Sequence, residues 1–426
     1  MKKTILILVA YYLPGFKAGG PIRSISGLVE GLSDEYDFKI ICGDRDLGDK
    51  RPFANLPAGL WHEYGAARVL RIPPGPAGAI RMLRAISSTS YDILYLNSIW
   101  SRVYSILPIV LRKSGLLLKM PIVLAPRGEL STGALRIKPR QKRLYLILAR
   151  KAKLFAGILW QASSQAEKID IMNSLGNVDV REAASIAAAS PGNSKLCGTY
   201  EEVSGSLDSS VVSGPVEALG GRVSKVVGEL RVVTLGRVCL MKNIEFAIGL
   251  FKGIRGRVIY DLYGPLEDEN YMAKCERQCA YLPDGVTVRF MGGIPHDAVH
   301  ETLSKYHLFL LPTLGENYGH VISEAMRAGC VALISDRTPW RNLEDAHSGW
   351  DLPLSSQDAF EAAIQNALAW TDEEFRQLSC NALSFVKNHT LTRDAIRANR
   401  LLFETALNTC SATMIERSKV VVRQKR

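Results

Sequence analysis

The fold of this 426-residue chain is decided by one segment, Leu308-Phe-Leu-Leu-Pro-Thr-Leu-Gly-Glu-Asn-Tyr-Gly-His-Val-Ile-Ser-Glu-Ala-Met-Arg-Ala-Gly329. Its apolar beginning predicts a buried strand that ends at Pro312, and a helix is predicted to start near Gly319 and stop at Gly329. The loop between them contains Gly315 and Glu316. In open α/β sheets, ligands bind at the carboxyl ends of strands, where a helix N-terminus presents free N–H groups to an anion. The segment therefore predicts an α/β fold with a binding site in this loop.

Apolar strands and helical stretches alternate on both sides of this segment, which is typical of parallel sheets with crossover helices. Strands are expected near residues 5–9, 38–42, 67–72, 93–97, 121–125, 158–161, 230–235, 258–263, 286–291, 308–312 and 331–335. We expect a first Rossmann-like domain at 1–205, a second at 206–395, and a helix with a basic tail at 396–426. The Gly- and Ser-rich stretch 190–228 is expected to be the hinge between the domains.

The composition is that of an ordered protein with ample core. Hydrophobic residues make up 47% of the chain, which excludes a disordered or fibrous protein. The eight cysteines form no C-x-x-C pair, so a reduced, cytoplasmic compartment is expected. The apolar run 4–10 is interpreted as the first strand and not as a signal peptide. We find no stretch of about 18 apolar residues that would predict a membrane-spanning helix.

The net charge of +11 is concentrated in the first half of the chain. Residues 81–160 hold 15 Lys and Arg against 2 Asp and Glu, interleaved with Leu, Ile and Tyr. This pattern favours an anionic membrane surface as a partner, and hence a peripheral protein on the inner face of the plasma membrane. A solvated helix face is the alternative. Nucleic acid is not an expected partner, because no recognition module accompanies the charge.

Basic residues and glycines earlier in the chain could bind the phosphates of a ligand held at the loop of Glu316. Gly236 and Arg237 end an expected strand, and Lys242 precedes the next helix. A fixed Arg and a Lys would stabilise the charge that builds up on a departing diphosphate, although residues in such positions are often only surface cations. Gly19 and Gly20 follow the first strand and could bring backbone N–H groups to a phosphate, or form a plain tight turn.

Glu316 and Glu324 could each accept a hydrogen bond from a hydroxyl, one from a sugar and one from a ribose. The spacing of two Glu residues eight apart says little by itself. Its weight comes from the position after a buried strand and from the cations and glycines upstream.

Together these residues resemble family 4 of the retaining glycosyltransferases, most closely the members that build bacterial surface polysaccharides. Further matches are Ala125-Pro-Arg-Gly-Glu129, Tyr263-Gly-Pro265 and Ser335-Asp-Arg-Thr-Pro-Trp340. The motifs occur in the family's order over roughly residues 1–400. The resemblance implies the glycosyltransferase B fold, in which two Rossmann-like doubly wound domains face a cleft, with a C-terminal helix that packs back on the first domain.

The resemblance also implies the site residues. Arg237, Lys242 and Glu316 would be catalytic, with the two cations on the donor diphosphate and Glu316 on a hydroxyl of the transferred sugar. Glu324 would hydrogen-bond the nucleotide ribose. The other expected donor contacts are Gly19, Gly20, Gly236, Asn317, Tyr318, Gly319 and His320. Asn97 and Arg127 are expected on the acceptor or sugar side, although many members carry a His where this chain has Asn97.

The implied reaction moves a hexose-type sugar from a UDP- or GDP-sugar to a lipid-linked or growing glycan in exopolysaccharide, capsule or O-antigen synthesis. Retention in this family is generally attributed to a same-face internal return with the leaving phosphate as base. No metal and no cofactor besides the donor substrate are expected. The alternatives are a sugar-nucleotide epimerase of the same fold and a catalytically inactive assembly partner.

Other candidate motifs have ordinary explanations. Asp44-Arg-Asp46 resembles a metal-binding pair but is expected to be a solvated turn, and the zinc-like spacing of His296 and His300 is expected to lie on a surface helix. His320 could lie near the donor or simply cap its helix. Trp340 could stack on the base or fix the loop.

Overall fold

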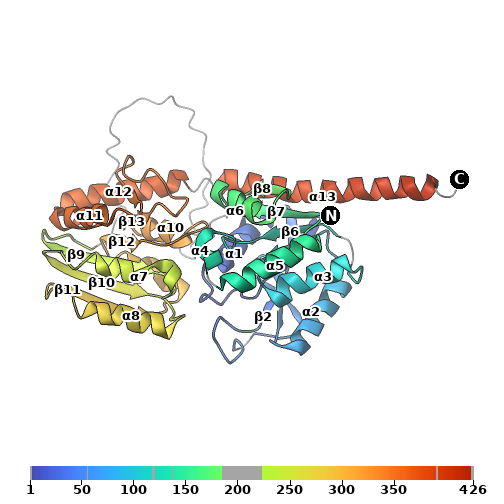
Figure 1. Ribbon diagram of the computed structural model, residues 1–426, viewed down its shortest axis with the longest axis horizontal. Coiled ribbons are helices and arrows are strands. Elements are labelled where there is room, and N and C mark those ends of the chain that lie inside the picture. The colour runs from blue at the N-terminus through green and yellow to red at the C-terminus, as the bar shows by residue number, and fades with distance from the viewer. Residues whose placement is uncertain are drawn as a thin grey trace, which may run out of the picture.

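The computed structural model describes residues 2–54, 56–117, 120–136, 138–184, 223–389 and 392–423. Two α/β domains lie side by side, each built on one sheet (Figure 1). The first domain holds the strands up to residue 182, and the second holds those from residue 229 onward. The expected class, two doubly wound parallel-sheet domains, is confirmed.

The first sheet has eight strands in the order β3-β4-β2-β1-β5-β6-β7-β8. Neighbouring strands are parallel except β3 and β4, which are antiparallel. The strands are β1 (Lys3–Leu8), β2 (Tyr36–Gly43), β3 (Trp61–Tyr64), β4 (Ala67–Ile72), β5 (Ile93–Asn97), β6 (Ile122–Ala125), β7 (Ile158–Ala162) and β8 (Val180–Glu182). The strand order reverses between β1 and β5.

Helices cover both faces of this sheet. They are α1 (Gly20–Leu32), α2 (Pro76–Ser88), α3 (Leu107–Lys113), α4 (Thr132–Arg136), α5 (Pro139–Lys151) and α6 (Gln165–Leu175). In α1, Ile25, Leu28 and Leu32 recur at helical spacing and are buried on one face of the sheet. Side chains of α2, α3, α5 and α6 are buried on the other face.

The second sheet is parallel throughout, in the order β11-β10-β9-β12-β13-β14. Its strands are β9 (Glu229–Leu235), β10 (Arg257–Tyr263), β11 (Val286–Gly292), β12 (Leu308–Leu311), β13 (Val331–Ser335) and β14 (Gly349–Leu352). One face is covered by α7 (Ile244–Gly249), α8 (Glu269–Cys279) and α11 (Gln357–Ala369). The other is covered by α9 (Val299–Leu303), α10 (His320–Arg327) and α12 (Asp372–His389).

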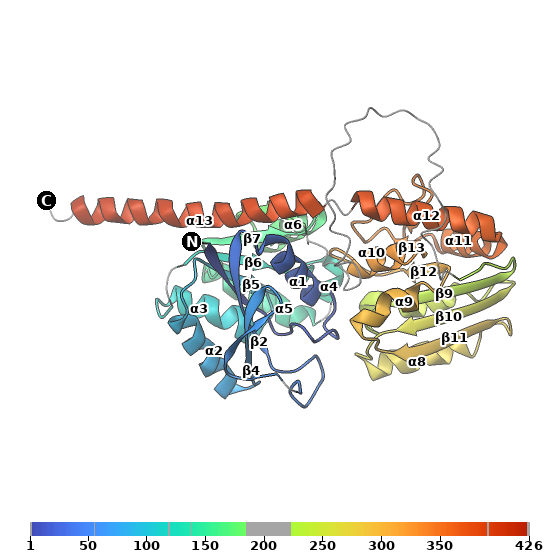
Figure 2. The same cartoon turned by 180° about the vertical axis from the view of Figure 1, so that it is seen from behind.

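The C-terminal helix α13 (Thr392–Arg423) returns to the first domain and lies along it (Figure 2). Leu402 and Phe403 are buried in the core beneath α1. Arg400 and Glu35 form a two-pronged ion pair, with N–O distances of 2.6 and 2.5 Å. The packing of a C-terminal helix on the first domain is therefore confirmed.

The loop at Asp44 and Asp46 differs from the expected solvated turn. The two residues are only 6% and 3% exposed. Asp46 accepts hydrogen bonds from the backbone N–H groups of Phe16 and Lys17 at 2.8 and 3.0 Å. The expectation was wrong because a carboxylate satisfies donors of the loop that follows β1, and buried backbone donors need such partners.

Some expected domain boundaries fall outside the described residues or inside a helix. The boundary at 205/206 and most of the expected hinge, 190–228, lie outside them. The expected boundary at 396 falls inside α13, which begins at Thr392. Among the helices that the structure describes, none is long and apolar enough to cross a membrane.

Candidate functional site

The carboxyl ends of the strands in the two domains approach each other. Ser163, which follows β7, donates a hydrogen bond to Asn317 Oδ1 at 2.6 Å, and Asn317 follows β12. A Cβ atom at Gly128, after β6, would lie only 3.2 Å from Asn317 Cβ. In the second sheet the strand order reverses between β9 and β12, and in open α/β sheets this is where ligands bind. The expected site therefore lies where the two domains meet.

An ion pair occupies this point of the second sheet. Lys242 ends a short 3₁₀ turn after β9, and its Nζ donates to Oε1 of Glu316, which follows β12. The two side chains are 12% and 15% exposed. Gly236 leaves room for the lysine, because a Cβ atom there would lie 3.0 Å from Lys242 Cε. The structure thus brings together three of the expected site residues.

Backbone hydrogen bonds hold the loop that carries Glu316. The Glu316 N–H donates to the carbonyl of Arg337 at 2.9 Å, and the Leu314 N–H donates to the carbonyl of Met241 at 2.9 Å. These bonds connect the loop after β12 with the segments after β13 and β9. The carboxylate and the ammonium group are therefore placed by a fixed backbone frame, which lowers the entropy cost of binding a ligand between them.

Arg237 makes a separate ion pair. Its Nη1 donates to Oε2 of Glu267, after β10, at 2.8 Å, and the two side chains are 39% and 46% exposed. A pair this exposed is weak and readily exchanged. Arg237 is thus held outside the Lys242–Glu316 pair, with its guanidinium accessible to an anionic ligand.

His320 joins the second domain to the first. It begins α10 after Gly319, whose φ of 75° suits glycine, and the helix has no side-chain cap. The imidazole Nε2 lies 3.0 Å from Ser24 Oγ in α1. Burial, Arg127 and Arg23 lower the pKa of His320 to about 3. The ring is therefore neutral at physiological pH and serves as a hydrogen-bonding group between the domains.

Glu324 lies in the next turn of α10 and also faces the first domain. Its Oε1 is 3.7 Å from Nη2 of Arg23 in α1. Burial raises the pKa of Glu324, while the positive charges of Arg23 and Arg327 oppose this rise. A carboxylate that is desolvated in this way is a strong acceptor for a hydroxyl group that enters the site.

The glycines at the start of α1 border open space. A Cβ atom built on Gly19 or Gly20 would meet no heavy atom within 4 Å. Gly19 has a φ of 67°, in the left-handed region that glycine adopts without cost. The start of α1 therefore leaves room for a ligand beside Arg23 and Ser24, which follow in the same helix.

Asn97 and Arg127 are in direct contact. Arg127 Nε donates to Asn97 Oδ1 at 2.8 Å, and Nη2 donates to the Tyr95 hydroxyl at 2.7 Å. Tyr95 donates in turn to Gln161 Oε1 at 2.5 Å, which completes a buried polar chain through the first domain. Asn97 is 4% exposed, so it orients Arg127 at the carboxyl end of the sheet.

Trp340 fixes the loop before α10. It is 1% exposed, and its Nε1 donates to the carbonyl of Tyr318 at 2.6 Å. The Tyr318 ring contacts the rings of both Trp340 and His320, at centroid distances of 5.8 and 4.5 Å. Of the two roles left open for Trp340, the structure supports the structural one, since a buried indole presents no face to a base.

Four residues of this region were not expected from the sequence. Arg23, Ser24 and Ser163 contact Glu324, His320 and Asn317 from the first domain. A cation one turn after the Gly19–Gly20 pair was an available signal for Arg23. The fourth residue, Glu129, ends the segment 125–129. Burial raises its pKa, and Ser98 and the Ile99 N–H donate hydrogen bonds to its carboxylate.

The structure shows the surroundings of two of the metal-candidate residues, Asp46 and His300. Within the described part of the chain, no three His, Cys, Asp or Glu side chains come together as a cation site. Asp46 is instead engaged by backbone N–H groups. His300 is exposed on the short helix α9, as expected.

Comparison with known proteins finds a family model and several solved structures that match this chain. The glycosyltransferases group 1 family model matches residues 222–383, the segment that carries Lys242, Glu316 and Glu324. Sucrose-phosphate synthase from Thermosynechococcus elongatus is similar over 95% of this chain and 99% of its own, with a TM-score of 0.65 and 16% identity. The chain has the glycosyltransferase B fold.

Other structures with the glycosyltransferase B fold agree over similar lengths. Anabaena HepE in complex with UDP and glucose matches at a TM-score of 0.60 and 16% identity, over 95% of this chain and 99% of its own. WaaG, a glycosyltransferase involved in lipopolysaccharide biosynthesis, matches at 0.54 and 13% identity, over 94% and 99%. No curated protein sequence matches this chain. At these identities the solved structures show the shared fold alone.

Proposed function

We propose that this protein is a metal-independent, retaining glycosyltransferase that moves a sugar from a nucleoside-diphosphate sugar to a lipid-linked or growing glycan in bacterial surface-polysaccharide synthesis. The observation that carries the proposal is the Lys242–Glu316 pair at the point where the strand order of the second sheet reverses. It lies within the glycosyltransferase group 1 match. A cation and a carboxylate at this point suit a ligand that has both a diphosphate and hydroxyl groups.

The donor would replace the ion pairs of the free site. Lys242 would leave Glu316, and Arg237 would leave Glu267, so that both cations contact the diphosphate. Glu316 would then accept a hydrogen bond from a hydroxyl of the sugar. Glu324 accepts from the ribose, and the backbone of Asn317, Tyr318, Gly319 and His320 borders the sugar and phosphates. Gly236, Gly19 and Gly20 leave room for close backbone approach. HepE in complex with UDP-glucose makes a UDP-sugar the first donor to test and a GDP-sugar the second.

The chemistry would be a same-face substitution. The bond between the anomeric carbon and the diphosphate oxygen breaks, and the acceptor hydroxyl attacks from the side on which the diphosphate leaves. The hydroxyl proton passes to the departing phosphate, so the configuration is retained without a glycosyl-enzyme bond. Lys242 and Arg237 stabilise the charge on the leaving group, and removing such a group costs about 10²- to 10³-fold in kcat.

The first domain would supply the acceptor side. Arg127, held by Asn97, lies at the carboxyl end of its sheet. The basic segment 81–160 includes α5, whose Leu144, Ile147 and Leu148 are exposed between basic residues. This face suits the anionic inner surface of the plasma membrane. Binding to phosphatidylglycerol vesicles that weakens as salt rises supports the membrane role, and equal binding to neutral vesicles contradicts it.

The function is tested first by a thermal-shift screen of UDP-, GDP- and ADP-sugars. A ligand at 100 times its dissociation constant adds about 2.7 kcal/mol of stability. The stabilising donor is then incubated with a lipid-linked acceptor and EDTA, and NMR gives the anomeric configuration of the product. A retained product formed in EDTA is expected, and an inverted one contradicts the mechanism. Formation of an epimer from UDP-N-acetylglucosamine alone would favour the epimerase, and absence of any nucleotide binding would favour an inactive partner.

A further inference from the structure

A cavity of about 640 Å³ lies at the amino edge of the first sheet, opposite the edge that carries the candidate functional site. It is entered between the starts of β6 and β7 and the ends of α3, α5 and α6, and α13 closes one side through Ala406 and Thr409. Small-molecule pockets in proteins measure roughly 300–1,000 Å³. The cavity is thus large enough for a ligand and is separate from the donor site.

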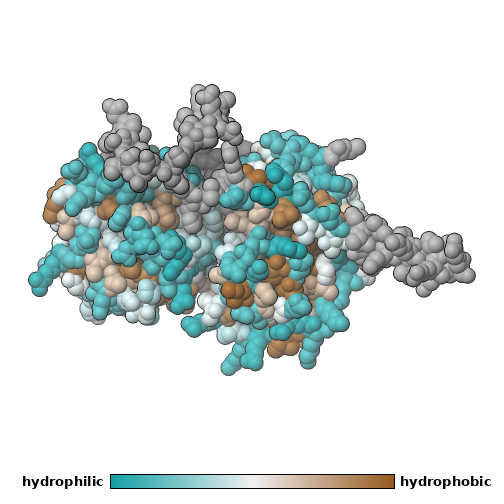
Figure 3. Space-filling model, turned by 90° about the horizontal axis from the view of Figure 1, so that it is seen from above, coloured by the Kyte–Doolittle hydropathy of each residue, from teal (hydrophilic) through white to brown (hydrophobic). Residues whose placement is uncertain are grey.

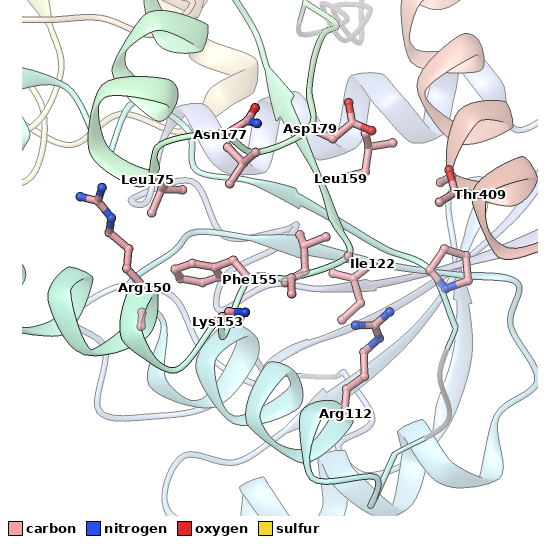
Figure 4. A pocket seen from close by; sticks show the side chains of 17 residues that line it. Arg112, Ile122, Arg150, Lys153, Phe155, Leu159, Leu175, Asn177, Asp179 and Thr409 are labelled. Atoms are coloured by element: carbon pink, nitrogen blue, oxygen red, sulfur yellow. The ribbon is translucent and has the colours of Figure 1, made fainter. Parts of the chain in front are cut away.

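Most of the lining is apolar. Phe155 and Ile122 lie in the middle, and Leu159 and Leu175 lie beyond them (Figure 4). The other apolar lining residues are Pro121, Ala149, Ala156, Gly157, Ile158 and Val178. A polar ligand such as a sugar would find few hydrogen-bonding partners among these side chains, so the lining favours a hydrocarbon chain.

Three basic side chains lie at different places around the same cavity. Arg112, Arg150 and Lys153 line it, and Asn177 and Asp179 lie on the opposite side from Arg112 and Lys153 (Figure 4). The carboxylate of Asp179 is 3.5 Å from Arg181 Nε, so it has a cationic partner outside the lining. The cavity therefore has an apolar interior and an excess of positive charge.

The surface beside the cavity is also both apolar and basic. On α5, Leu144, Ile147 and Leu148 share one face and are 59%, 42% and 56% exposed. Leu116, just beyond α3, is 72% exposed. Figure 3 shows hydrophobic residues grouped among hydrophilic ones on one face of the molecule. An exposed apolar group rimmed by basic residues is typical of a surface that meets lipid.

We propose that this cavity binds a single anionic phospholipid, with one acyl chain against Phe155 and Ile122 and the phosphate at Lys153, with Arg150 and Arg112 on either side of it. The proposal deepens the membrane role given under the proposed function, because it adds a specific lipid site to a general attraction between charges. It does not depend on the donor, since the cavity lies at the other edge of the sheet.

The test uses the full chain and a short-chain lipid below its micelle concentration, so that no membrane is present. Dihexanoyl phosphatidic acid is titrated calorimetrically, with dihexanoyl phosphatidylcholine and inorganic phosphate as separate arms. The variant Arg150→Gln/Lys153→Gln removes two cavity cations. The matched control, Arg143→Gln/Lys151→Gln, removes two exposed cations of α5 that do not line the cavity. All four side chains belong to exposed residues, so both variants are expected to fold.

We expect the phosphatidic acid to bind the native protein and the cavity variant to bind it about 10- to 30-fold more weakly. The control variant should lose less than about threefold, because general charge attraction is weaker than contact with the phosphate. Equal losses in the two variants, or no binding of the lipid at all, would overturn the proposal. So would equal affinity for inorganic phosphate, since the acyl chain would then contribute nothing. A result for or against this site leaves the donor experiments unaffected.

Discussion

Arg23 of α1 and Glu324 of α10 form an ion pair between the two domains, with 3.7 Å between Nη2 and Oε1. The cation belongs to the first domain, and the carboxylate belongs to the domain proposed to hold the donor. Burial raises the pKa of Glu324, and the charge of Arg23 opposes the rise. The protonation state of a proposed ribose acceptor is thus coupled to the position of the other domain.

This coupling predicts a pH effect on donor affinity. Only the ionised Glu324 accepts two hydrogen bonds well, so donor affinity should fall as pH drops through its raised pKa. In Arg23→Gln the carboxylate loses a favourable charge, and the fall should begin at a higher pH than in the native protein. Dissociation constants measured from pH 5 to 8 check this. An unchanged midpoint in the variant would show that Arg23 does not act on Glu324.

Lys242 is expected to act on the rate of sugar transfer as well as on nucleotide binding. Lys242→Ala should lower kcat by about 10²- to 10³-fold, because the charge of the leaving diphosphate loses a fixed donor. Lys252→Ala is the control, since Lys252 is exposed just after α7. Initial rates with the identified donor and a lipid-linked acceptor check this. Loss of similar size in both variants would argue against a specific role for Lys242.

His320 is expected to remain neutral across the physiological range. Burial and the neighbouring Arg127 and Arg23 lower its pKa to about 3, below the ordinary value near 6.5. Protonation would therefore destabilise the fold, and stability linked to His320 should be complete above about pH 6.5 and fall as pH drops toward 3. NMR of the imidazole nitrogens checks this prediction. A transition of the His320 signal between pH 6 and 7 would contradict it.

Asn97 is expected to contribute to stability more than to donor binding. Asn97→Ala removes the hydrogen bond that Arg127 Nε donates, and a hydrogen bond that involves a charged group contributes about 1.5–3 kcal/mol. Urea unfolding of the first domain should show this loss, while the nucleotide dissociation constant stays within about twofold. A large loss of nucleotide affinity with unchanged stability would instead place Asn97 at the donor.

The sequence predicted the central strands well, because their apolar runs are buried on both faces. It missed β3, β8 and β14, which lie at the edges of the sheets. Edge strands carry polar residues, as in Trp61–Tyr64 and Val180–Glu182, so their periodicity is weak. The solvated turn at Asp44 and Asp46 was wrong for a related reason, since a local pattern does not show which distant backbone groups a carboxylate satisfies.

The candidate site could be predicted on the second domain, where Lys242 and Glu316 follow neighbouring strands. The contacts of Arg23, Ser24 and Ser163 could not, because they depend on how the two domains pack. The burial of Trp340 likewise favours a structural role, and its place in a loop did not reveal that burial.

The central claim is that the site formed by Lys242, Glu316 and Glu324 holds a nucleoside diphosphate. Calorimetric titration of UDP, GDP and ADP into the native protein, Lys242→Ala and Glu324→Ala tests it most directly. We predict that one nucleotide binds the native protein and that each variant binds it at least about tenfold more weakly, as expected for loss of a charged hydrogen bond. Equal binding by all three proteins, or no binding of any nucleotide to the native protein, would contradict the account.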